Sequence, residues 1–89
     1  WQTIGPRFET RAEISFYQPH AHVVGMTVAS ECILASECKI PYSAICMIDN
    51  YANGVVNEEL TFASFKEQVR ANEAQLVTII KTLLEKLSP

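Results

Sequence analysis

The sequence predicts an α/β domain, because helical patterns alternate along the chain with short apolar runs that are typical of strands. Helical spacing occurs at residues 10–17, 28–38 and 61–87, and strand-like runs occupy residues 21–26 and 42–48. A chain of 89 residues is too short for a second domain. We therefore expect one domain over residues 1–89.

The first half of the chain predicts one helix and one strand. Thr10 and Glu13 have the spacing of a capping box, so a helix is expected to begin at this point. It should end at about Tyr17, before Pro19. The run 21–26 is short and rich in valine, which favours a strand.

The second half predicts a buried strand between two helices. The helix at 28–38 should end before Pro41, and the nearly all-apolar run 42–48 is typical of a strand covered on both faces. Thr61 is a candidate N-cap for a helix that reaches Leu87. That helix would be roughly 39 Å long, whereas a globule of this size has a radius of gyration near 13 Å. We therefore expect the chain to pack against further polypeptide.

Composition excludes several classes of protein. The chain is 48% hydrophobic and 19% charged, which is too apolar for intrinsic disorder. No apolar run approaches the roughly 18 residues of a membrane span. The net charge is −3 and the basic residues are scattered, so nucleic acid is not an expected partner. We expect a soluble protein.

The cysteines and the N-terminal residues indicate the cellular compartment of the protein. The three cysteines are odd in number and fit reduced thiols better than a secreted disulfide framework. The N-terminal residues lack the charged and apolar regions of a signal peptide. The sequence predicts a cytoplasmic protein. Because it opens with Trp1 rather than Met, we expect either processing or a part of a longer chain.

Phe8, Glu9 and Asn50 are candidates for binding a flat heterocycle. An aromatic ring beside a carboxylate can stack on such a ring while the carboxylate accepts hydrogen bonds from its N–H groups. Asn50 follows the apolar run 42–48, at the strand end where ligands bind in α/β sheets, and its amide both donates and accepts. The alternatives are a hydrophobic staple for Phe8, a solvated Glu9 and a turn role for Asn50.

Thr27 and Met26 lie between the expected strand and the next helix. The Thr27 hydroxyl and nearby amides could contact an anion, and Met26 could lie against a sugar. The alternatives are an ordinary N-cap for Thr27 and core filling for Met26.

The sequence does not predict a metal site or a cysteine nucleophile. His20 and His22 follow Pro19 at an expected turn, and the cysteines lack the paired short spacing of zinc sites. Cys46 lies within the run expected to form a buried strand, where a thiol is unreactive.

Four stretches together resemble the C-terminal third of the trimeric purine nucleoside phosphorylase and methylthioadenosine phosphorylase family. They are Gly5–Glu13, Val24–Thr27, Ser30–Glu31 and Ile48–Tyr51, and the resemblance covers nearly the whole chain. It implies the C-terminal portion of a three-layer α/β/α nucleoside phosphorylase fold, incomplete without an N-terminal portion. It also implies a pentosyltransferase activity, in which phosphate cleaves a purine nucleoside to the free base and pentose 1-phosphate.

The resemblance assigns roles to the candidate residues. Phe8 would pack against the purine, and Glu9 would bind the edge of its pyrimidine ring. Asn50 would hold the 6-substituent and the adjacent ring nitrogen, and would stabilise the charge that develops on the leaving base. Met26 would face the ribose and Thr27 would touch phosphate. Inorganic phosphate would be the co-substrate, and no cofactor is expected.

The same residues bear on specificity. Glu9 and Asn50 together favour a 6-oxopurine. An apolar pocket lined by Phe62 or Phe65 would instead accept a 5′-methylthio group, so a methylthioadenosine or methylthioinosine phosphorylase remains an alternative.

The resemblance also bears on partners. The phosphate loop and most of the family's sheet belong to an N-terminal portion, which we expect to be a separate chain or lost, leaving this chain inactive alone. A homo-oligomer, trimer or hexamer, is expected. Two alternatives remain. One is a noncatalytic interaction module that binds a partner through its long C-terminal helix, and the other is a degenerate phosphorylase remnant that binds bases without turnover.

Overall fold

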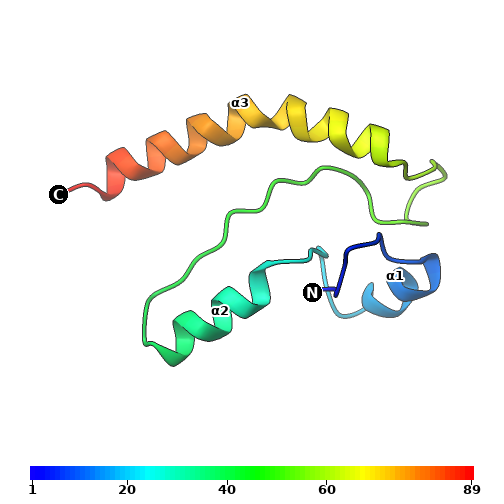
Figure 1. Ribbon diagram of the computed structural model, residues 1–89, viewed down its shortest axis with the longest axis horizontal. Coiled ribbons are helices and arrows are strands. Elements are labelled where there is room, and N and C mark those ends of the chain that lie inside the picture. The colour runs from blue at the N-terminus through cyan, green and yellow to red at the C-terminus, as the bar shows by residue number, and fades with distance from the viewer. The chain divides into compact units, whose positions relative to one another are not determined.

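The computed structural model describes all residues from Trp1 to Pro89 and contains three helices (Figure 1). They are α1 (Arg11–Tyr17), α2 (Val28–Glu37) and α3 (Phe62–Leu87). The chain divides into two compact units. The first unit comprises residues 1–46 and 52–59, and the second comprises residues 47–51 and 60–89. None of the helices combines the length and the apolar character that crossing a membrane requires.

Helix α1 begins as its sequence predicts. The Thr10 hydroxyl accepts a hydrogen bond from the Glu13 amide at 3.1 Å, and the Glu13 carboxylate accepts one from the Thr10 amide at 3.0 Å. This reciprocal pair is a capping box and satisfies amides that the first turn would leave without partners. The prediction of a helix ending at Tyr17 is confirmed.

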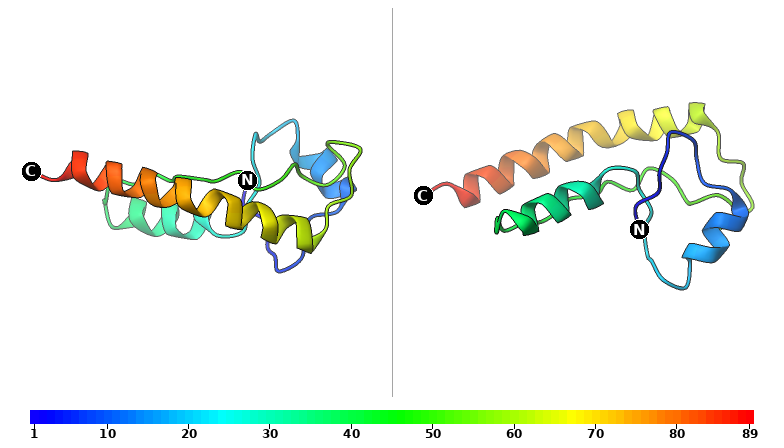
Figure 2. Two further views of the ribbon diagram at one scale, coloured as in Figure 1. Left: turned by 90° about the horizontal axis from the view of Figure 1, so that it is seen from above. Right: turned by 60° about the horizontal axis from the view of Figure 1, so that its bottom comes forward.

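Helices α2 and α3 also match the prediction. Helix α2 ends at Glu37, with Cys38 as its C-cap. Helix α3 is one continuous helix of 26 residues in all views (Figure 2). Its N-cap is Thr61, whose hydroxyl accepts a hydrogen bond from the Ser64 amide at 3.1 Å.

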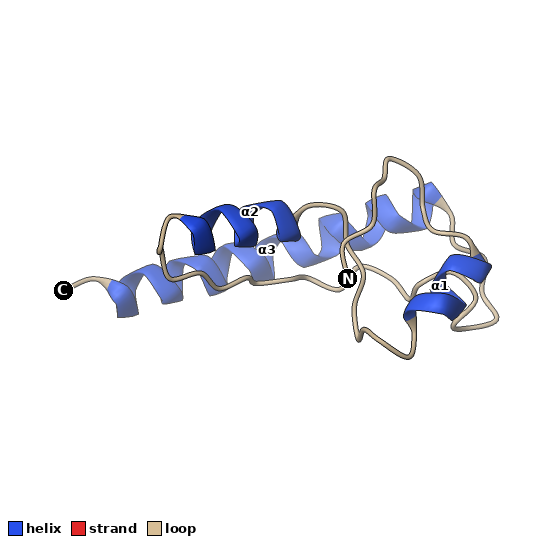
Figure 3. Ribbon diagram, turned by 90° about the horizontal axis from the view of Figure 1, so that it is seen from below, coloured by secondary structure: helices blue, strands red, loops and turns tan.

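The two predicted strands are absent, and that part of the prediction is wrong for this chain. Figure 3, which reserves red for strands, shows helices and loops throughout. An extended segment becomes a strand only when a neighbouring strand pairs with it. In the run 21–26, Gly25 forms a single parallel bridge with Gln2. The run 42–48 has no β partner at all.

Few apolar side chains are buried. Ile14, at 5% exposure, is the one buried hydrophobic residue, and Thr3 and Glu9 are the buried polar ones. Cys46 is exposed, contrary to its expected place in a buried strand, because the run 42–48 has no sheet around it. The apolar content of the sequence is therefore largely uncovered in this chain.

Candidate functional site

The loop that leads into α1 begins at a position that only glycine fits well. Gly5 has a φ of 66°, which lies in the left-handed region that side chains disfavour. A Cβ at this position would also lie 2.9 Å from the sulfur of Met26. Met26, a predicted site residue, is thus half-buried against the loop that carries Phe8 and Glu9.

An ion pair between Arg7 and Glu13 joins the two ends of the segment that contains Phe8 and Glu9. A terminal nitrogen of Arg7 donates to the Glu13 carboxylate at 2.7 Å and to the carbonyl of Phe8 at 3.1 Å. The hydrogen bond from Arg7, together with the one from the Thr10 amide, lowers the pKa of the Glu13 carboxyl from 4.5 to about 2. The same pair raises the pKa of Arg7. The charged forms of both groups are therefore favoured.

Glu9 is the most unusual side chain in this loop. It is 9% exposed, and its Oε2 atom is buried without a hydrogen-bond partner. The Asn53 amide donates to the main-chain carbonyl of Glu9 at 3.3 Å and leaves the carboxylate untouched. Burying an acceptor without a partner costs about 1–3 kcal/mol, and more for a charged group. A ligand that donates an N–H group to Oε2 would remove this cost.

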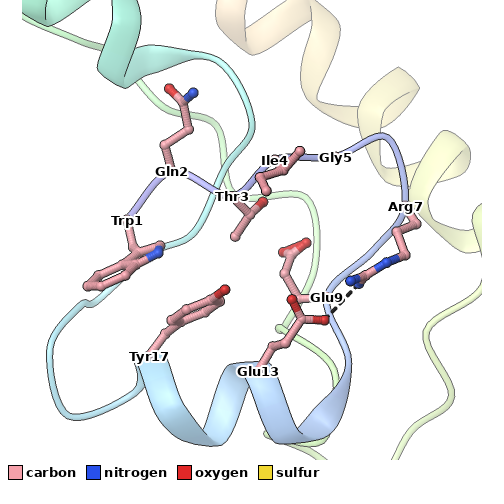
Figure 4. A pocket seen from close by; sticks show the side chains of 9 residues that line it. All are labelled: Trp1, Gln2, Thr3, Ile4, Gly5, Arg7, Glu9, Glu13 and Tyr17. Carbon is pink, nitrogen blue, oxygen red and sulfur yellow. Dashed lines mark hydrogen bonds and ion pairs between the residues drawn. The ribbon is translucent and has the colours of Figure 1, made fainter.

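A pocket of about 280 Å³ surrounds Glu9 in the first unit. In Figure 4, Glu9 and Thr3 point toward one another near its middle, and the Arg7–Glu13 pair forms one side. The opposite side is aromatic. The lining residues are Trp1, Gln2, Thr3, Ile4, Gly5, Arg7, Glu9, Glu13 and Tyr17.

The aromatic side of the pocket is a stacked pair that sequence reasoning missed. The ring centroids of Trp1 and Tyr17 lie 4.9 Å apart, with 25° between the ring planes. The two residues are far apart in sequence and belong to no motif. No pattern in the sequence could have paired them. The pair gives the pocket an aromatic side opposite the Arg7–Glu13 pair.

The other predicted residues lie outside this pocket. Phe8 is half-buried and does not line it. Thr27 is exposed and occupies the N-cap position of α2, as the alternative reading expected, but its side chain makes no capping hydrogen bond. Asn50 is exposed in the second unit, where its amide donates to the Tyr51 carbonyl at 2.8 Å.

The side chains that bind metals in other proteins do not gather in this structure. No three His, Cys, Asp or Glu side chains are placed to hold a metal ion. The three cysteines are free and exposed. The residues that line the pocket offer carboxylates, a guanidinium and aromatic rings, which suit an organic ligand with N–H donors.

Replacing Arg7 with Gln is expected to return the pKa of the Glu13 carboxyl toward 4.5. Because the folded-state pKa is lowered, the pair stabilises the loop above about pH 4.5, and this stabilisation is lost as the pH falls toward 2. Carbon-13 NMR of the glutamate carboxyls during an acid titration measures the shift. Arg11→Gln is the matched control and should leave Glu13 unchanged. If the pKa of Glu13 in Arg7→Gln is the same as in the unmodified chain, the pairing of Arg7 with Glu13 is contradicted.

Comparisons with known proteins identify the family. The model of the phosphorylase superfamily matches residues 1–85. A probable 6-oxopurine nucleoside phosphorylase of Archaeoglobus fulgidus is 36% identical over 98% of this chain and 36% of its own length. A probable S-methyl-5′-thioinosine phosphorylase of Methanocaldococcus jannaschii is 37% identical over 92% of this chain and 32% of its own.

A 6-oxopurine nucleoside phosphorylase of Pyrococcus furiosus is 39% identical over 88% of this chain and 30% of its own length. The chain thus spans about a third of the length of these relatives. No solved structure matches it significantly. Because the family model extends over nearly the whole chain, the chain belongs to the phosphorylase superfamily.

Proposed function

We propose that this chain supplies the base-binding part of a nucleoside phosphorylase that acts on 6-oxopurine nucleosides. The observation that carries the proposal is the buried Oε2 atom of Glu9, which has no hydrogen-bond partner and lines a pocket with an aromatic wall. A purine is flat and carries N–H groups at its edge. It can therefore offer Glu9 a donor while its faces lie against an aromatic ring.

The preference for a 6-oxopurine follows from donor and acceptor positions. Hypoxanthine and guanine carry an N–H at N1, which donates to a carboxylate, whereas adenine presents a lone pair at N1 that a carboxylate repels. The relatives' names agree in the class of base, because some are named for a 6-oxopurine nucleoside and another for a thioinosine, whose base is also a 6-oxopurine. We assign Glu9 to the N1 edge and Asn50 to O6 and N7, with Phe8 beside the ring.

Asn50 is the proposed catalytic residue. As the glycosidic bond breaks, the sugar becomes oxocarbenium-like and the leaving base gains negative charge. An amide donor at N7 stabilises charge that is present mainly in the transition state, and so accelerates the reaction. Phosphate then completes the displacement at the sugar. The remaining proposed contacts are Met26 with the sugar and Thr27 with phosphate, for which the Thr27 hydroxyl is free of a capping bond.

A 5′-methylthio substrate is the second candidate. The rings of Phe62 and Phe65 are stacked in the second unit, with centroids 6.0 Å apart. Phe62 is 61% exposed. This apolar pair suits a methylthio group better than a 5′-hydroxyl. Some relatives are named for a 5′-thioinosine and others for a 6-oxopurine nucleoside, so the sugar distinguishes the two candidates.

We further propose that catalysis requires polypeptide corresponding to the rest of the relatives' length. Ile14 is the one buried apolar residue in a chain that is 48% hydrophobic. Exposed apolar surface on this scale marks an interface. We propose that this chain is inactive alone and functions in a homo-oligomeric enzyme, a trimer or a hexamer. The exposed free cysteines favour a reducing, cytoplasmic location.

Reconstitution tests the proposed function. The chain is co-expressed with the part of the Archaeoglobus fulgidus relative that lies outside the match, and each part alone is the control. We expect phosphate-dependent cleavage of inosine and guanosine, and slower cleavage of adenosine. Methylthioinosine, compared with inosine, decides between the two sugars. Absence of cleavage with every substrate by an assembled complex would contradict the proposal.

A further inference from the structure

Asn72, in the middle of α3, connects this helix to the segment that carries Asn50. Its side-chain nitrogen donates to the Ile48 carbonyl at 3.3 Å and to the Asp49 carboxylate at 3.2 Å. Its side-chain oxygen accepts from Gln68 at 3.2 Å. All of these residues belong to the second unit. The Asn72 amide thus uses both its donor and its acceptor capacity.

The segment that Asn72 holds has little else to fix it. Residues 41–51 make no hydrogen bond between backbone groups. The bond from Asn72 to the Ile48 carbonyl is the one hydrogen bond that joins the backbone of this segment to a helix. The side chain of Asn50 donates only to its neighbour Tyr51. The position of Asn50 relative to α3 therefore depends on the residues just before it.

Asparagine is also a poor choice for the middle of a helix. It is less favourable there than alanine, because its short amide competes for backbone hydrogen bonds. Here the amide is half-buried and is directed to partners outside the helix. A position that only helped to form α3 would favour a stronger helix former.

We propose that Asn72 is a positioning residue, which fixes the Ile48–Asp49 backbone so that Asn50 is held ready for the base. This inference rests on the proposed function of Asn50. Asn72 itself does not touch the ligand in this account. Its effect on base binding must therefore pass through Asn50, and it must disappear when Asn50 has no amide to position.

The variant Asn72→Leu tests this inference in the full 89-residue chain, with hypoxanthine as the probe. Leucine removes the donor, has a similar size and favours a helix. Gln75→Leu is the matched control, because Gln75 is exposed on the same helix. The two measurements are nitrogen-15 relaxation at residues 48–51 and hypoxanthine affinity, each with and without Asn50→Ala.

We expect Asn72→Leu to increase the mobility of residues 48–51 and to weaken hypoxanthine binding by about 3- to 10-fold, as for one hydrogen bond. In the Asn50→Ala background the weakening should vanish, because the two residues act on the same contact. Helix content should stay unchanged, and Gln75→Leu should behave as the unmodified chain.

Each contrary result has its own meaning. Unchanged mobility at residues 48–51 would overturn the inference directly, whatever happens to binding. Equal weakening with and without Asn50→Ala would also overturn it, because Asn72 would then act on the fold alone. If Asn50→Ala itself leaves hypoxanthine binding unchanged, the proposed function of Asn50 fails, and with it the assignment of Asn72 as a positioning residue for the base.

Discussion

Replacing Glu9 with Met is expected to weaken hypoxanthine binding by about 10- to 100-fold and, in the same variant, to stabilise the fold. A hydrogen bond to a charged group contributes about 1.5–3 kcal/mol, and 1.4 kcal/mol corresponds to a tenfold change in affinity. Methionine is close to glutamate in length but has no carboxylate to accept the N–H of the base. Isothermal titration with hypoxanthine measures the loss.

The stability of this variant should change in the opposite direction. In the unliganded chain Oε2 is buried without a partner, which costs about 1–3 kcal/mol. Removing the carboxylate removes that cost, so the free energy of unfolding in urea should rise. A residue kept for ligand binding at the expense of stability is expected to behave in this way.

Glu58→Met is the matched control for Glu9. Glu58 is exposed in the same unit, so its replacement should alter neither affinity nor stability appreciably. A Glu9 variant that unfolds more easily and still binds hypoxanthine would show that the carboxylate is structural. The assignment of the pocket to a purine would then be wrong.

Replacing Ile14 with Ala should destabilise the first unit by about 2–5 kcal/mol, the range for truncating a buried isoleucine. Ile14 is the one buried apolar side chain, and small domains have only about 5–15 kcal/mol in total. A large decrease in the free energy of unfolding is therefore the expected result. The fluorescence of Trp1, the single tryptophan, reports on this transition because its ring stacks on Tyr17 of α1.

Ile33→Ala provides the comparison for Ile14. Ile33 is 58% exposed on α2, so the same chemical change should alter the free energy of unfolding by less than about 0.5 kcal/mol. Equal effects at the two positions would contradict the view that the first unit depends on a single buried residue.

The helices could be predicted because their signals are local. Thr10 with Glu13, and Thr61 alone, supply side-chain acceptors for amides of the first helical turn. Glu9 could be selected for a similar reason, since an aromatic residue and a carboxylate on a loop before a helix are visible in the sequence. The burial of Glu9 and its unpartnered Oε2 atom could not be predicted from the sequence.

The remaining features depend on contacts between distant residues. The runs 21–26 and 42–48 have the composition of strands, but a strand also needs a partner, and composition does not supply one. The stacking of Trp1 on Tyr17 and the bonds from Asn72 join residues 16 to 24 positions apart. No periodicity marks them. These contacts are seen only in the folded structure.

The most direct test of the account is a crystal structure of the reconstituted enzyme with hypoxanthine. We predict that the Glu9 carboxylate accepts the N1–H of the base and that the Asn50 amide bonds its O6 or N7, each at roughly 2.6–3.2 Å. Hypoxanthine bound with neither side chain in contact, or with Glu9 still unpartnered beside it, would contradict the central claim.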